Sequence, residues 1–363
     1  MIRPEESAHG RETVIVTGSS GLIGSAVVNR LAERYRVLAW DKVPPKHELP
    51  DTATYQAIDL TSDENVQQHV AALKDTAAGR IASVVHLAAY YDFSGEPSPL
   101  YEQVTVRGSE RLVRALREHE IHTEQFLFCS TMLVHRPTRP GEPIHEDSAT
   151  VTTWDYPASK LRTEAVLHKH HGDIRLLVLR VAGVYTDRCE SIPIAQQIKR
   201  IYERQMTSRV FPGDAQHGQA WVHLEDLVEA IDRGVDRRTS LPAELTVLIG
   251  EPEVMSYEQM QRVLGRLIHG RQWATHRIPK VVAKTGAWVQ NRLGAGEFIK
   301  PWMTDFADDH YELDISRARL VLDWEPRHRL RDALKKMAAS LKADPGAWYE
   351  AHGFKRANAA AAR

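Results

Sequence analysis

A short stretch near the amino terminus, Thr13 to Gly24, limits the possible folds of this chain more than any other. It reads TVIVTGSSGLIG, so an uncharged, β-branched run leads into three glycines spaced three residues apart. The run predicts a buried parallel strand over 13–16. Gly18 would let the chain turn off that strand, and Gly21 would let the backbone approach a pyrophosphate. Gly24 would let the next helix, 22–33, pack closely on the sheet.

The start of that helix predicts a phosphate-binding site. Ser20, Leu22 and Ile23 surround its first turn, where free N–H groups and the helix dipole favour an anion. A second apolar strand, 36–40, ends at Asp41, 17 residues after Gly24. Dinucleotide-binding folds place a carboxylate there to accept hydrogen bonds from the adenosine ribose. Because a carboxylate repels a 2′-phosphate, the sequence predicts NAD rather than NADP.

Strand and helix patterns alternate as far as residue 184. This order predicts an α/β fold, a Rossmann-type doubly wound parallel sheet with helices on both faces. We expect an NAD-binding domain over 12–184 and a smaller, mostly helical substrate lobe over 185–354, with segments around 219–250 returning to the first domain. The tails 1–11 and 355–363 are predicted to be disordered. Further expected strands are 54–58, 81–87, 125–129, 174–181 and 246–249, and further expected helices are 63–73, 100–119, 156–171, 191–205, 256–269 and 281–293.

Composition excludes several classes of partner. Hydrophobic residues make up 42% of the chain and charged residues 26%, which is typical of a soluble globular protein. The 47 Lys and Arg residues balance the 48 Asp and Glu residues, so no net field attracts nucleic acid or a membrane. With only two cysteines and no signal or membrane segment, we expect a cytoplasmic protein. His168, His170 and His171 lie near a predicted helix end, where cations meet the helix dipole, so no metal site is predicted.

Several expected strand ends bring small or polar residues to the ligand-binding edge of the sheet. Asp59 and Leu60 follow the third strand, and Asp59 is a candidate acceptor for the adenine amino group. The fourth strand ends in HLAA, where Leu87, Ala88 and Ala89 would let a cofactor lie against the backbone. The fifth delivers Ser130 and Thr131 to the same edge.

Tyr156 and Lys160 are the candidate acid/base pair. They lie four residues apart at the start of a predicted helix, which places both on one face. A phenol with an ordinary pKa near 10 is a poor base, but a nearby ammonium and a nicotinamide cation favour the phenolate. The pair then serves as a proton relay. A hydroxyl from Thr131, or from Ser130 beside it, would hold the substrate oxygen while hydride passes to or from nicotinamide.

These motifs together resemble the extended short-chain dehydrogenases/reductases, also called NAD-dependent epimerase/dehydratases. The resemblance implies NAD bound across the sheet near Val184, Tyr156 as catalytic acid/base, Lys160 lowering its pKa and binding the nicotinamide ribose, and Thr131 as the hydroxyl partner. It also implies a homodimer formed through the helices near 100–119 and 156–171. The matching segments run in order from TGSSGLIG (17–24), Asp41, Asp59-Leu60 and HLAA (86–89) through CST (129–131), YPASK (156–160) and LRVAGVY (179–185) to WVHLEDLVEAI (221–231) and LDISRARLVLDWEP (313–326).

Departures from the family pattern bear on the substrate. Dehydrating members typically carry Asp-Glu where this chain has Met132 and Leu133, so dehydration and decarboxylation are disfavoured. Nucleotide-sugar enzymes of the family usually clamp the diphosphate with two arginines, and the corresponding positions are Gln219 and Tyr311. Arg188 or Arg204 are possible substitutes. The usual Asn before a Gly-Thr pair is also replaced, by Thr105.

Two substrate classes therefore stay open. The first is a sugar or nucleotide sugar, epimerised or oxidised at a secondary hydroxyl. The second is a hydrophobic, sterol-like alcohol or ketone. It is suggested by the neutral clamp positions and by an apolar segment over 277–303, which would either pack the core of the lobe or line a pocket. An NAD-sensing protein without activity is disfavoured because Tyr156, Lys160 and Thr131 are all present.

Overall fold

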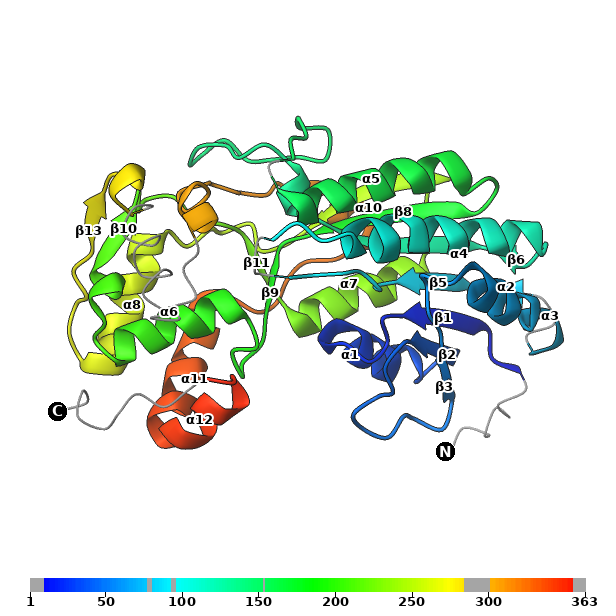
Figure 1. Ribbon diagram of the computed structural model, residues 1–363, viewed down its shortest axis with the longest axis horizontal. Coiled ribbons are helices and arrows are strands. Elements are labelled where there is room, and N and C mark those ends of the chain that lie inside the picture. Colours follow the sequence, from blue (N-terminus) through cyan, green and yellow to red (C-terminus); the bar gives the residue numbers. More distant parts are fainter. Residues whose placement is uncertain (1–9, 77–79, 93–95, 153, 284–300, 355–363) are drawn as a thin grey trace.

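Seven parallel strands form the centre of the protein (Figure 1). The computed structural model describes residues 10–76, 80–92, 96–152, 154–283 and 301–354. The sheet order is β12-β8-β7-β5-β1-β2-β3, which changes direction between β1 and β5 and so creates a ligand crevice at the carboxyl ends of these strands. The strands are β1 (Thr13–Thr17), β2 (Arg36–Asp41), β3 (Ala53–Ala57), β5 (Ser83–His86), β7 (Gln125–Thr131), β8 (Arg175–Val181) and β12 (Glu244–Ile249).

Helices cover both faces of the sheet and bury two separate cores. On one face lie α1 (Leu22–Leu31), α7 (Leu224–Asp236) and α10 (Ser316–Leu322). On the other lie α2 (Asp63–Ala71), α4 (Arg107–Glu118) and α5 (Asp155–His170). Short elements at the end of this layer are α3 (Leu73–Thr76), β4 (Arg80–Ile81) and β6 (His122–Thr123). The predicted doubly wound α/β fold is confirmed.

Local sequence explains why these helices form where they do. Ser62 caps α2 by accepting a hydrogen bond from the Asn65 N–H, and Val66 and Val70 are buried one turn apart. The expected helix over 100–119 differs from the prediction. It begins as a π-helix, η2 (Tyr101–Val106), and continues as α4. Hydrophobic spacing over so short a segment does not distinguish a π-turn from an α-turn.

The carboxy-terminal lobe is mostly helical, as predicted, and has its own core. It lies at the opposite end of the molecule from β2 and β3 (Figure 1). Its elements are α6 (Ile192–Tyr202), η4 (Met206–Arg209), β10 (Val210–Pro212), α8 (Tyr257–His269), β13 (His276–Ile278), η5 (Pro301–Thr304), α11 (Leu330–Ala343) and α12 (Pro345–Ala351). No helix within the described residues is both long and apolar enough to cross a lipid bilayer.

Some expectations fall on residues that the structure does not describe. Most of the helix predicted over 281–293 lies outside the described residues, as do 1–9 and 355–363 of the predicted tails. Val281 and Val282 are described, and they are 77% and 57% exposed. These two side chains of the apolar segment therefore do not pack into the core of the lobe.

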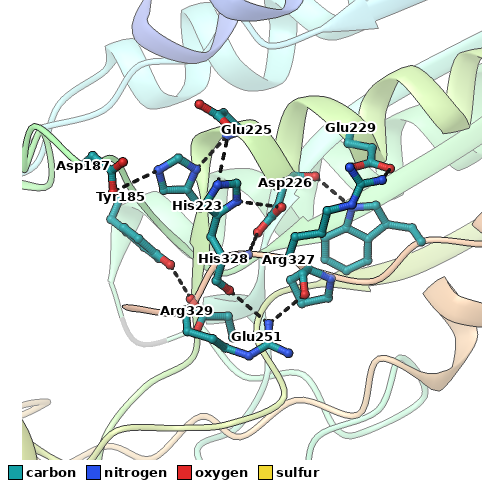
Figure 2. Close-up of polar contacts among 12 residues, drawn as sticks. Tyr185, Asp187, His223, Glu225, Asp226, Glu229, Glu251, Arg327, His328 and Arg329 are labelled. Atoms are coloured by element: carbon teal, nitrogen blue, oxygen red, sulfur yellow. Dashed lines mark hydrogen bonds and ion pairs between the residues drawn. The ribbon is translucent and has the colours of Figure 1, made fainter. Parts of the chain in front are cut away.

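A cluster of polar side chains joins the lobe to the sheet (Figure 2). Glu251, just after β12, accepts hydrogen bonds from the Tyr185 hydroxyl at 2.8 Å and from the Leu330 N–H, at the start of α11, at 3.1 Å. Asp226 of α7 accepts a hydrogen bond from the His328 N–H at 2.9 Å and lies 3.0 Å from His328 Nδ1. Two buried carboxylates therefore hold the backbone at His328 and Leu330, on either side of the residue that caps the start of α11, Arg329.

Glu251 should make the protein less stable as the pH rises. Burial raises the pKa of its carboxyl to about 7, so the folded protein binds this proton more tightly than the unfolded chain does. The free energy of unfolding then decreases as the pH rises from about 4.5 through 7. Glu251→Gln keeps an acceptor oxygen but removes the charge. We expect urea unfolding at about pH 8 to show the variant more stable than the wild type by up to about 3 kcal/mol.

The exposed Glu253 provides a matched control, since Glu253→Gln changes the same side chain in the same loop. That variant should keep the wild-type dependence of stability on pH. A Glu251→Gln protein whose stability falls with pH as steeply as that of the wild type would contradict the expected role of Glu251.

Candidate active site

The glycine-rich turn has the geometry that the sequence predicts. Gly18 has φ +69°, and a Cβ placed on it would lie 2.8 Å from the Ala88 nitrogen. A Cβ on Gly24 would lie 2.0 Å from the Gly18 carbonyl oxygen. Both positions therefore require glycine. Gly21 is the N-cap of α1 and offers no capping side chain, so it leaves the first N–H groups of the helix free of a side-chain cap.

Asp41 lies at the edge of this turn, at the end of β2. Its Oδ2 accepts a hydrogen bond from the Ser20 N–H at 2.9 Å, and its Oδ1 accepts one from the Val43 N–H at 3.1 Å. The Ser20 hydroxyl donates to the Val43 carbonyl at 2.6 Å. The carboxylate therefore supports the turn as well as offering acceptor oxygens to a ribose. Leu22 is 42% exposed and Ile23 is partly buried at the start of α1.

The Asp59 carboxylate is already engaged within the protein. Thr61 donates its hydroxyl at 2.7 Å, and Lys42 donates its ammonium at 2.9 Å. These hydrogen bonds lower the pKa of Asp59 to about 2, so it is ionised at neutral pH. Leu60 beside it is buried. The predicted adenine contact of Asp59 stays a prediction, and it must use lone pairs that Thr61 and Lys42 leave free.

The end of β5 lies against the glycine turn. The N–H groups of Leu87 and Ala88 donate to the Thr17 carbonyl and hydroxyl at 3.2 and 3.3 Å. This places the HLAA segment against Gly18, with Leu87, Ala88 and Ala89 partly buried. Val184 lies in β9 (Gly183–Tyr185), which pairs with β11 (Trp221–His223).

The residues at the end of β7 meet one face of α5. The Thr131 hydroxyl acts on the Tyr156 phenol and favours its ionised form, and the Lys160 ammonium donates to the Cys129 carbonyl at 2.7 Å. This ammonium also lies 4.8 Å from the centre of the Phe128 ring. The structure thus brings together the predicted Thr131, Tyr156 and Lys160.

Burial shifts the pKa values of both titratable groups on this face, Tyr156 and Lys160. It lowers the pKa of Lys160 to about 8, close to physiological pH. It raises the pKa of Tyr156 above its ordinary value, although the Thr131 hydroxyl acts in the opposite direction. In the protein alone the phenol is therefore neutral. We expected Lys160 to lower this pKa, but in the protein alone it does not. The lowering therefore requires the charge of a bound nicotinamide in addition to Lys160.

Ser130 has a different partner from Thr131. Its hydroxyl donates to Glu164 at 2.5 Å, in the buried layer behind the site. This contact leaves Thr131 as the hydroxyl beside the phenol. Ser130 bonds to a buried carboxylate instead of to the substrate oxygen considered for it above. Glu164 was not among the predicted site residues. Its position four residues after Lys160, on the same helix face, was the signal that would have found it.

Aromatic side chains surround Tyr156. The Tyr91 ring makes an edge contact with the Tyr156 ring at 4.7 Å, and the Trp154 ring lies 5.5 Å away. The Tyr90 N–H donates to the Thr105 hydroxyl at 2.9 Å, which fixes the loop before Tyr91. Thr105, at the position of the usual asparagine, thus accepts a hydrogen bond from the Tyr90 N–H. Tyr91 is 50% exposed, so part of its ring is open to a substrate.

Gln219 and Tyr311, the neutral residues at the expected clamp positions, are neighbours in the structure. They form an isolated parallel bridge, in which the Ala220 N–H donates to the Tyr311 carbonyl at 2.8 Å. Tyr311 is buried, and Gln219 is partly exposed. Met132 is buried beside the predicted site, and Leu133 is partly buried. The structure therefore places together the two positions that depart from the arginine clamp.

Two clusters in the structure contain the residue types that bind metal ions. His168 and His171, at the end of α5, lie 2.6 and 3.0 Å from oxygens of Glu244, the first residue of β12. Both imidazoles therefore engage this carboxylate. His223, Glu225 and His328 have candidate ligand atoms within 4.8 Å of one another. However, the two imidazole rings stack at 4.0 Å with planes 22° apart, so their in-plane lone pairs run side by side instead of converging on one ion. This cluster therefore lacks the geometry of a metal site.

Solved structures share the whole fold at low sequence identity. MoeE5 in complex with UDP-glucose and NAD is 20% identical, with a TM-score of 0.67 over 92% of this chain and 100% of that chain. A UDP-glucuronic acid 4-epimerase from Bacillus cereus, in complex with UDP-glucuronic acid and NAD, is 19% identical, with a TM-score of 0.68 over 91% of this chain and 99% of that chain. A UDP-glucose 4-epimerase from Thermotoga maritima is 20% identical, with a TM-score of 0.65 over 91% and 99%.

The family assignment comes from the sequence match. No curated protein sequence matches this chain. The model of the NAD dependent epimerase/dehydratase family matches residues 14–250, well over half of the chain, and this range includes the glycine turn, Asp41 and the face of α5 described above. The turn, the uncapped start of α1 and the Asp41 carboxylate fit a dinucleotide. The chain therefore belongs to the NAD dependent epimerase/dehydratase family and is an NAD-dependent enzyme.

Proposed function

We propose that this protein transfers hydride between NAD and a secondary hydroxyl or ketone of a sugar or nucleotide sugar. The observation that carries the proposal is the placement of Thr131, at the end of β7, with Tyr156 at the start of α5, while Lys160 one helical turn later binds the Cys129 carbonyl of the same strand. The nucleotide sugars bound in MoeE5 and in the Bacillus cereus epimerase support this substrate class.

The three side chains divide the chemistry between them. NAD supplies or accepts the hydride. Tyr156 removes the hydroxyl proton during oxidation or returns it during reduction, and Thr131 donates or accepts a hydrogen bond at the same oxygen. Lys160 supplies a positive charge near the phenol and reaches the nicotinamide ribose. Epimerisation uses the same relay twice, with the transient ketone presenting its other face to the reduced cofactor.

A hydrophobic alcohol or ketone is the second candidate substrate. The rings of Tyr91 and Trp154 beside Tyr156 favour a substrate with an apolar face next to the reacting carbon. Gln219 and Tyr311 offer no positive charge to a diphosphate. The sugar class is still preferred, because C–H faces of pyranose rings also pack on aromatic side chains.

Thermal-shift screening in the presence of NAD discriminates between the two substrate classes. We expect UDP- or GDP-sugars to raise the melting temperature, since a ligand that binds only the folded state stabilises it. Each stabilising compound is then tested for formation or consumption of NADH. Stabilisation and turnover by hydrophobic cyclic ketols alone would replace the first proposal with the second. No turnover of NADH and no isotope exchange at the carbinol carbon of any stabilising compound would reject both.

We also infer a homodimer formed through α4 and α5. The outer sides of these helices and of η2 carry exposed charges, including Arg107, Arg114 and Arg162. An interface there would be ionic, so it should weaken in salt. Sedimentation velocity at low and high salt tests this, and a monomer at low salt would contradict it.

A further inference from the structure

Glu164 holds a fixed carboxylate behind the proposed active site. It lies on α5, one helical turn beyond Lys160 and two beyond Tyr156, on the face that meets β7. It accepts the Ser130 hydroxyl at 2.5 Å and two hydrogen bonds from Arg180, at 2.7 and 3.2 Å. Ser130 and Arg180 are paired neighbours on β7 and β8. All three side chains are buried, so this arrangement is rigid and shielded from salt.

Arg180 is held equally firmly, and Glu164 is its anionic partner. Besides Glu164, its guanidinium donates to the Glu146 carbonyl at 2.9 Å and lies 3.0 Å from His135 Nε2. Burial lowers the pKa of His135 to about 4, so this ring is neutral at physiological pH and accepts the hydrogen bond. The guanidinium therefore fixes the position of the Glu164 carboxylate.

The groups around Lys160 differ in charge from the Glu164 carboxylate. From β7, the Cys129 carbonyl accepts a hydrogen bond from the Lys160 ammonium, and the Phe128 ring lies beside the charge. Burial raises the pKa of the Cys129 thiol to about 12, so it is uncharged. His86 of β5 is neutral because burial and Lys160 lower its pKa to about 3. Among the described groups that act on Lys160, Glu164 is thus the carboxylate, and it is paired with the Arg180 guanidinium.

We propose that Glu164, fixed by Ser130 and Arg180, is a positioning residue that keeps Lys160 cationic and directed at the nicotinamide ribose. The inference rests on the role proposed above for Lys160. The pKa of Lys160 is about 8, so a loss of negative charge nearby makes the ammonium lose its proton in the physiological range. Removing the charge of Glu164 therefore weakens cofactor binding at alkaline pH but not at acidic pH.

The test is the affinity for NADH, measured by fluorescence titration from about pH 6 to about pH 10. In the wild type, affinity should fall above about pH 8 as Lys160 deprotonates. In Glu164→Gln, this decrease should begin at least about half a pH unit lower, while affinity near pH 6 stays close to the wild-type value. Lys160→Met should remove the decrease, which assigns it to Lys160.

A second variant guards against misfolding. Glu164→Gln leaves the Arg180 charge buried without its partner, which is destabilising. The double variant Glu164→Gln with Arg180→Gln replaces the ion pair by two amides and should show a displacement in the same direction but smaller, because the repulsion from Arg180 is removed as well. A uniform loss of affinity at every pH, a decrease unmoved in both variants, or one that persists in Lys160→Met would overturn the inference. Because no substrate is used, this result is independent of whether the proposed reaction is correct.

Discussion

Tyr156→Phe should lower turnover by about 10²- to 10⁴-fold, the usual contribution of a positioned acid/base group. The variant keeps the aromatic ring that packs against Tyr91 and Trp154 but loses the hydroxyl on which Thr131 acts. NADH affinity should remain close to that of the wild type, because the glycine turn and Asp41 are untouched. The measurement is NADH absorbance with a substrate identified by thermal shift, together with fluorescence titration of NADH.

The same substitution at Tyr349 is a matched control. The Tyr349 hydroxyl donates to Glu203 within the carboxy-terminal lobe, outside the proposed site. Tyr349→Phe should keep wild-type turnover. Turnover that survives in Tyr156→Phe would mean that another group moves the proton, and the proposed relay would have to be abandoned.

Asp41→Ala should reduce NAD affinity by about tenfold or more and relax the discrimination against NADP. Hydrogen bonds to a charged group contribute about 1.5–3 kcal/mol, and about 1.4 kcal/mol corresponds to a factor of ten. The Ser20 N–H, which the carboxylate now holds, would also lose its partner. Lys42 next to Asp41 is 71% exposed and would then offer a cation to the 2′-phosphate of NADP.

Asp41→Asn separates the two roles of this carboxylate. The amide oxygen retains an acceptor for the Ser20 N–H, but the charge that repels a 2′-phosphate is gone. We therefore expect NAD affinity to fall less than in Asp41→Ala, while NADP affinity rises in both variants. Isothermal titration with each cofactor measures these changes. Equal affinities for NAD and NADP in the wild-type protein would contradict the role assigned to Asp41.

Most of the fold was predictable because its signals are local. The strand over 13–16 and the turn at Gly18 appear in the structure with small shifts at their ends, and the strand expected over 246–249 forms the edge of the sheet as β12. Buried parallel strands are continuous apolar runs, and such runs can be recognised without knowledge of their neighbours. The π-helix before α4 was not predicted, because its side-chain spacing over a single turn resembles that of an α-helix.

The sequence by itself determined the type of cofactor and the candidate relay. Only glycine fits the crowded, left-handed geometry of the turn at Gly18, a carboxylate at Asp41 repels phosphate, and a spacing of four puts Tyr156 and Lys160 on one helix face. These are properties of residues close together in the chain.

Tertiary structure alone decided which side chains complete the site. Ser130 and Thr131 are adjacent and chemically alike, yet one faces Glu164 and the other faces Tyr156. Which hydroxyl meets which side chain depends on where β7 ends along α5, because Tyr156 lies two helical turns before Glu164 on the same helix face. The pairing of Glu164 with Arg180 likewise depends on the register of β7 and β8, which strand pairing sets and residue type does not.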